Sequence, residues 1–263
     1  RRVARRTGRR VATESQGDGG HGPLYQFTVE KFVDINIGGL ELHITNAALW
    51  MFAATILVIA FTTLFVGKRA MVPGRMQSLV EVTYEFIANM IRDNVGSDGR
   101  AYFPFVFTLF MFILACNMLG MLPYSFTVTS QIVVTFGLAF VVFIGVTIIG
   151  FMKHGIGFFG FFLPTGVPGF LAPLVIPIEV LSYLIRPVSL GLRLFANLTA
   201  GHTMLKVFAG FIAPLGAFYI IPGAIPMAAV VGLTILEFAI AFLQAYVFAV
   251  LSCIYLHDAL EMH

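Results

Sequence analysis

Charge is scarce in this sequence of 263 residues. Asp, Glu, Lys and Arg together make up 11% of the chain, whereas 59% is hydrophobic, and the mean hydropathy is +0.92. Soluble domains carry about 25% charged residues, so this composition excludes an ordinary soluble domain. A lipid bilayer is the solvent that fits, because it requires no polar protein surface.

Cysteine is also scarce. The two cysteines, Cys116 and Cys253, both lie in apolar runs. Their number and spacing predict neither a disulfide framework nor a metal site, so we interpret both as packing residues.

The basic charge is concentrated at the start of the chain. Residues 1–10 contain six of the sixteen Lys and Arg residues, and without them the net charge would change from +3 to −3. Such a run can contact nucleic acid or anionic lipid, or form a disordered tail. We expect residues 1–10 to be absent from the mature protein, because Val11 followed by Ala-Thr-Glu-Ser is typical of a start read from a GTG codon.

Long uncharged runs predict membrane spans. Residues 47–66 contain no charge and are long enough to cross about 30 Å of hydrocarbon at 1.5 Å per residue. The uncharged stretch 101–152 is long enough for two spans, divided near Pro123. Two long apolar segments finish the chain, at about 172–212 and 223–257, separated by Pro214 and Pro222. The sequence therefore predicts an all-α integral membrane protein with about five transmembrane helices, of which the last two form a hairpin.

The remaining segments connect or precede these spans. Residues 1–46 are mixed and polar and form an N-terminal arm, which leaves 47–263 as the membrane domain. Between the first two spans, apolar residues at helical spacing predict an amphipathic helix that lies at the membrane surface or leans on the bundle: Leu79, Val82, Phe86 and Ile87. Residues 155–170, rich in Gly, Pro and Phe, predict a re-entrant or interfacial loop.

The loop charges predict an orientation. In a five-span arrangement, six basic residues fall in two connections on one side: Lys68, Arg69, Arg75, Arg92, Arg100 and Lys153. The opposite connections, near 122–127 and 213–222, carry none. The positive-inside rule then places the N-terminus outside and the C-terminus in the cytoplasm.

Ionisable side chains interrupt the last two apolar segments. They are Glu179, Arg186, Arg193, His202, Lys206 and Glu237, accompanied by the amides Asn197 and Gln244. A charge inside hydrocarbon costs about 2.5–3.5 kcal/mol on insertion scales. A purely structural bundle could use Ser, Thr and Gly instead, so this set indicates a function.

Spacing divides these residues into two groups. Glu179, Arg186 and Arg193 are seven apart and share one helix face, with Asn197 one turn beyond. The same face carries small residues, which allow another helix to approach closely: Ser189, Ala196 and Ala200. His202 is about half a turn away from Arg193, so the two should serve separate environments.

An antiparallel hairpin predicts which groups meet. Glu237 and Gln244 are also seven apart, and the pairing would bring Gln244 near Arg193 and Glu237 near His202. Structural explanations stay open: Arg186 and Arg193 could extend to the interface, Glu179 could neutralise Arg186, and His202 with Glu237 could be a buried pair.

Two runs resemble subunit a of the F-type ATP synthases: PVSLGLRLFANLTAGH at 187–202 and LQAYVFAVLSCIYL at 243–256. The resemblance implies a proton-translocating stator subunit with two aqueous half-channels, in which Arg193 acts on the carboxylates of a rotating c-subunit ring. It also implies b-type peripheral stalk subunits and other synthase subunits as partners. It implies no cofactor, metal, bound nucleotide, nucleic acid or covalent chemistry for this chain.

The resemblance also assigns the other polar residues. Asn197 is similar to a position beside the essential arginine, and Gln244 to the glutamine that faces it. His202 and Glu237 are similar to the outer half-channel pair, with acid and imidazole exchanged relative to many bacteria, as in mitochondrial members. This exchange favours an alphaproteobacterial origin and hence a bacterial inner membrane.

Two other classes of function stay open from the residues alone. A non-rotary proton channel or secondary transporter would often show internal repeats, and the sequence contains none that we find. An intramembrane enzyme would need a nucleophile with a base, which Ser182, Ser189 and Ser252 lack in the sequence.

Overall fold

The computed structural model describes residues 31–37, 40–64, 74–122, 125–162, 171–218 and 220–261. Helices make up nearly all of these ranges, and one short hairpin supplies the only strands among them. The prediction for residues 1–10 lies outside the described residues. So do Pro123 and the second half of the Gly/Pro/Phe-rich stretch.

A two-stranded antiparallel hairpin precedes the membrane helices. It consists of β1 (Lys31–Ile37) and β2 (Leu40–Thr45), within the N-terminal arm. Apolar residues alternate in both segments, which is the pattern of a strand: Val33, Ile35 and Ile37 in β1, and Leu40, Leu42 and Ile44 in β2. Thr45 ends the hairpin and caps α1, because its Oγ1 accepts the backbone N–H of Ala48 at 3.3 Å.

Within the described ranges, five helices are long and apolar enough to cross a membrane. They centre on α1 (Asn46–Leu64), α3 (Phe103–Gly120), α4 (Ile132–His154), α5 (Ala172–Phe218) and α6 (Ile220–Leu260). The described parts of the connections include three 3-10 helices: η2 (Ser97–Tyr102), η3 (Val128–Ser130) and η4 (Gly155–Phe162). The prediction of an all-α membrane protein with about five spans is confirmed.

The amphipathic helix is α2 (Arg75–Val95), and it packs on α3 and α6. Of the apolar residues at helical spacing, Ile87 is buried, whereas Leu79 and Val82 are more than half exposed. The buried residues lie further round the helix and toward its C-terminal end: Val80, Ile87, Met90, Ile91 and Val95. Apolar residues of a membrane protein need not face the core, because lipid solvates them as well.

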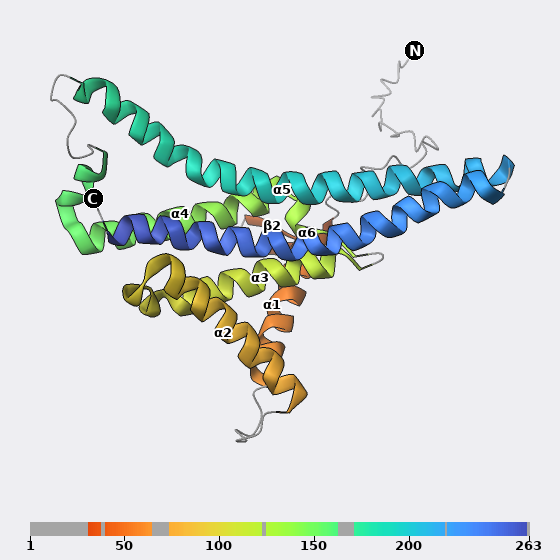
Figure 1. Ribbon diagram of the computed structural model, residues 1–263, viewed down its shortest axis with the longest axis horizontal. Coiled ribbons are helices and arrows are strands. Elements are labelled where there is room, and N and C mark those ends of the chain that lie inside the picture. Colours follow the sequence, from red (N-terminus) through yellow and green to blue (C-terminus); the bar gives the residue numbers. More distant parts are fainter. Residues whose placement is uncertain are drawn as a thin grey trace, which may run out of the picture.

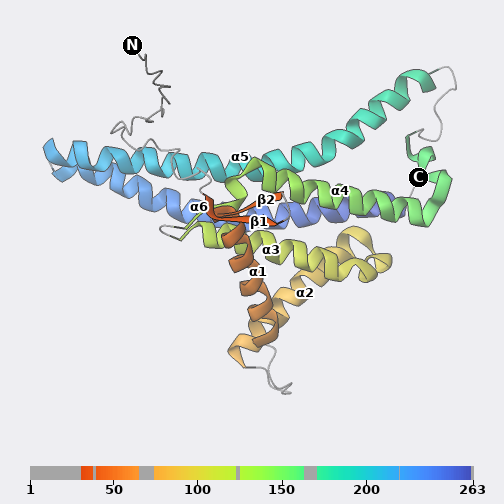
Figure 2. The same ribbon diagram turned by 180° about the vertical axis from the view of Figure 1, so that it is seen from behind.

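Helices α5 and α6 form the predicted hairpin and lie side by side along the long axis (Figures 1 and 2). The expected loop between Pro214 and Pro222 is shorter than predicted, because α5 continues to Phe218 and α6 begins at Ile220. Pro222 lies in the first turn of α6, where its missing N–H would have no intrahelical partner. With 47 residues, α5 is about 70 Å long, so it can fit a bilayer only when strongly inclined or extended beyond it.

The centre of the bundle is the small-residue face of α6. Ala241, Ala245 and Ala249 are fully buried there, which lets the neighbouring helices approach closely. Asn117 of α3 donates from Nδ2 to the Ala241 carbonyl at 3.0 Å and ties α3 to α6. Cys116 and Cys253 are free and buried, as expected for packing residues.

Candidate functional site

Helix α5 has one buried face and one open face. Leu190, Leu194 and Leu198 are buried against the bundle, so residues on the opposite side are exposed. Arg193 lies on this open face and forms no ion pair within the described part of the chain. Its neighbours there are also exposed: Ser189, Leu192, Ala196, Asn197 and Ala200. A fixed cation therefore stands on a flat surface of mostly small side chains.

Asn197 and Gln244 connect this open face to α6. Asn197 donates from Nδ2 to Gln244 Oε1 at 2.9 Å. Gln244 is 2% exposed, and its Nε2 has no hydrogen-bond partner among the described residues. The hairpin thus places Gln244 next to Asn197, one turn along α5 from Arg193, and leaves an amide donor unused at that point.

His202 and Glu237 face each other farther along the hairpin. His202 Nδ1 lies 3.8 Å from Glu237 Oε1, and the two side chains are 12% and 4% exposed. Neither carboxyl oxygen of Glu237 has a hydrogen-bond partner within the described residues. Gly201 makes room for this carboxyl, because a Cβ on Gly201 would lie 2.5 Å from Glu237 Oε1.

A threonine that sequence reasoning missed completes this group. Thr127 precedes η3, is 6% exposed, and places its Oγ1 3.2 Å from His202 Nε2. The same hydroxyl lies 3.3 Å from the Gly120 carbonyl. A threonine between two spans carries no periodic signal, so only the folded chain brings it to His202.

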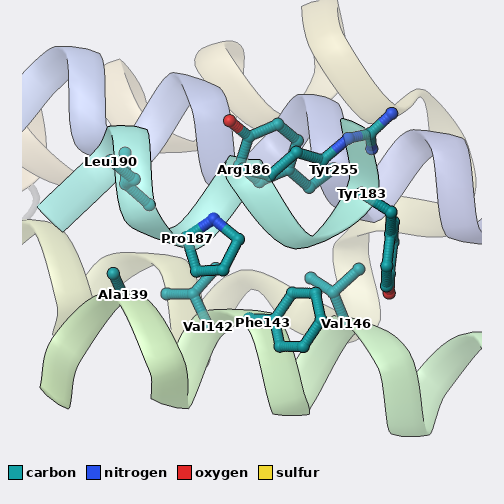
Figure 3. Close-up of a pocket in the computed structure, with 9 residues that line it drawn as sticks. All are labelled: Ala139, Val142, Phe143, Val146, Tyr183, Arg186, Pro187, Leu190 and Tyr255. Carbon is teal, nitrogen blue, oxygen red and sulfur yellow. The ribbon is translucent and has the colours of Figure 1, made fainter. Parts of the chain in front are cut away.

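The other end of α5 carries a separate ion pair. Arg186 donates from Nη1 to Asp258 Oδ2 at 2.8 Å, and its guanidinium lies over the rings of Tyr183 and Tyr255 at 5.6 and 5.1 Å. Figure 3 shows Arg186 at the edge of an apolar pocket between α4, α5 and α6. The suggested neutralisation of Arg186 by Glu179 is thus replaced by Asp258, which we did not predict.

Glu179 stands apart from this group. It is half-buried near the start of α5 and forms no ion pair with any residue that the structure describes. The polar residues of the hairpin therefore form three groups along it, at Arg186, at Arg193 with Asn197, and at His202.

Comparison with known proteins decides the family. A family model described as ATP synthase A chain matches residues 48–257, which include all of these groups except Asp258. The chain belongs to this family. It is 54% identical to ATP synthase subunit a of Paramagnetospirillum magneticum over 244 residues, which are 92% of this chain and 99% of that protein. It is also 54% identical to ATP synthase subunit a of Rhodospirillum rubrum over 243 residues, 92% of this chain and all of that protein.

Membership of the ATP synthase A chain family fixes the coarse function. The chain is a multi-pass membrane subunit of the proton-translocating ATP synthase and has no catalytic site of its own. Its relatives are mostly alphaproteobacterial, as the exchanged acid and imidazole indicated. The prediction of the family from residues 187–202 and 243–256 is confirmed.

Proposed function

We propose that this chain is the stator subunit that passes protons to and from a rotating c-subunit ring, with Arg193 as the fixed charge between two aqueous half-channels. One observation carries the proposal: Arg193 stands unpaired, among the described residues, on the open face of α5. An unpaired cation inside the membrane costs about 2.5–3.5 kcal/mol on insertion scales, and a group of opposite charge beside it would offset this cost.

A carboxylate that passes along the α5 face would meet this need. The guanidinium stays charged at physiological pH and presents several N–H donors, so it favours the ionised form of an arriving carboxylate. Each ring carboxylate would release its proton on reaching Arg193, and the fixed charge would oppose direct passage of H⁺. Small neighbours such as Ala196 and Ala200 allow a ring helix to come close.

The two half-channels would use the groups on either side of Arg193. His202 and Glu237 form the outer path. Asn197 and Gln244 supply the hydrogen-bonding groups beside Arg193. Glu179 and Arg186 lie toward the other end of α5 and would border the inner path. The three groups fit a route that is interrupted at the ring and not continuous through this chain.

The proposed partners follow from the same surfaces. The ring covers the open face of α5, while b-type peripheral stalk subunits, other synthase subunits and lipid cover the rest. We also propose that the chain lies in a bacterial inner membrane with its N-terminus outside and its C-terminus in the cytoplasm, because the positive-inside rule favours the basic connections on the cytoplasmic side.

The test replaces Arg193 by Ala and, separately, by Lys in the complete synthase and measures ATP-driven proton pumping in inverted vesicles. We expect both variants to lose coupled pumping, because Lys keeps the charge but not the planar fork of donors. The matched control is Arg75→Ala, an exposed arginine at the start of α2, which should pump normally. Normal pumping by Arg193→Ala would refute the role of Arg193.

A further inference from the structure

His202 has two ring nitrogens, and the structure gives each a different neighbour. Nε2 lies 3.2 Å from Thr127 Oγ1, whereas Nδ1 lies 3.8 Å from Glu237 Oε1. A neutral imidazole carries its proton on only one nitrogen. Which nitrogen is protonated therefore decides whether His202 can accept a proton on the side of Glu237.

The Gly120 carbonyl settles the direction of the threonine hydrogen bond. Gly120 ends α3, where the last carbonyls have no intrahelical partner, and the residue is buried. Thr127 Oγ1 lies 3.3 Å away, and no other donor to this carbonyl is found among the described residues. Leaving such an acceptor unpaired is disfavoured about tenfold or more. The single hydroxyl proton of Thr127 is thus directed to Gly120.

The oxygen of Thr127 is then left as an acceptor. It can receive a hydrogen bond only from a protonated Nε2, because a bare Nε2 would meet the threonine lone pairs. We propose that Thr127 is a positioning residue that holds His202 as the Nε2–H tautomer, so that Nδ1 is the atom that exchanges a proton with Glu237.

The proton movement balances on these two residues. A protonated Glu237 gives its proton to Nδ1, which yields a carboxylate and an imidazolium, and the reverse step restores both neutral groups. At 3.8 Å the step needs a small swing of the carboxyl or one bridging water. On the Nε2 side, the hydrogen bonds run through Thr127 and end at the Gly120 carbonyl. This carbonyl has no proton to donate and cannot relay one onward. His202 therefore exchanges protons from one side only.

The function of this tautomer in transport depends on the proposed function, but the tautomer itself does not. The test uses the full chain with ¹⁵N-labelled histidine in lipid bilayers. It is carried out near pH 8, where a free imidazole is almost entirely neutral. Solid-state NMR distinguishes protonated from bare ring nitrogens, and a His202→Gln sample identifies which signals belong to His202. We expect His202 to be protonated at Nε2.

Three variants separate the tautomer from general packing. Thr127→Val should shift the ratio of tautomers about tenfold toward Nδ1–H and lower ATP-driven pumping, whereas Thr127→Ser should preserve both. Thr129→Val is the control in the same turn, because Thr129 is fully buried and its hydroxyl has no hydrogen-bond partner among the described residues. It should leave the His202 signals unchanged.

Two results would overturn the proposal: native His202 protonated at Nδ1, or an unchanged tautomer in Thr127→Val. Failure of the Arg193 test would leave the tautomer result standing. Conversely, a wrong tautomer would leave the role of Arg193 intact.

Discussion

Gly201 is a position where one added methyl group should slow proton transport. A Cβ there would lie 2.5 Å from Glu237 Oε1 and 3.1 Å from its Cδ, whereas ordinary contacts begin near 3.4 Å. In Gly201→Ala the carboxyl must therefore move by about 1 Å. A displacement of about 1 Å in a reacting group lowers rates as much as 100-fold.

The assay is the initial rate of ATP-driven proton pumping by the complete synthase in inverted vesicles. We expect Gly201→Ala to pump about 10- to 100-fold more slowly than the native protein. Gly210→Ala is the matched control on the same helix, because nothing lies within 4 Å of its added Cβ. Equal pumping rates in the two alanine variants would refute the idea that proton transport depends on the position of the Glu237 carboxyl.

Two further predictions concern stability. Asp258→Asn should lower the free energy of unfolding by about 1–2 kcal/mol, because it leaves the partly buried Arg186 without its carboxylate. Thermal unfolding of the purified complex measures this loss. The control is Asp98→Asn, which breaks the exposed pair with Lys153, and an equal or larger loss of stability in this control would contradict the prediction. Gly150→Ala should also destabilise by about 1–3 kcal/mol, because its Cβ would overlap the ring of Phe158. Gly145→Ala, whose Cβ would make only an ordinary contact, should unfold like the native protein.

Periodic features of the fold were predictable from the sequence. A charge-free run long enough for the bilayer leaves little choice but a helix, which is why α1, α3 and α4 were placed correctly. Spacing also predicted that Glu237 would meet His202, because residues seven apart on antiparallel helices stay on facing sides.

Contacts that follow no helical spacing were not predicted. Thr127, which follows α3 in the chain, contacts both His202 and Gly120, and no spacing rule predicts such contacts from a connection between helices. Asp258 did carry a signal, since it lies two heptads beyond Gln244 on the same face. We overlooked it because a charge near the end of a span is normally solvated and needs no partner.

The buried face of α2 could not be predicted, for another physical reason. In water an exposed Leu79 or Val82 is unfavourable, so apolar residues indicate the core. Beside lipid this inference fails, because the membrane accepts apolar side chains as readily as the bundle does. The pattern of polar residues is then the better guide to the site that we propose on the hairpin.

The central claim is that the open face of α5 meets a ring of carboxylate-bearing subunits. The direct measurement is disulfide formation between Ala196→Cys and a cysteine placed beside the ring carboxylate, in the complete synthase under mild oxidation. The native Cys116 and Cys253 are buried and should not interfere. We predict a cross-link to the ring for Ala196→Cys, reversible by reductant, and none for Phe52→Cys, which is 67% exposed on α1. The absence of any cross-link from Ala196→Cys to the ring in an intact, active complex would contradict the account.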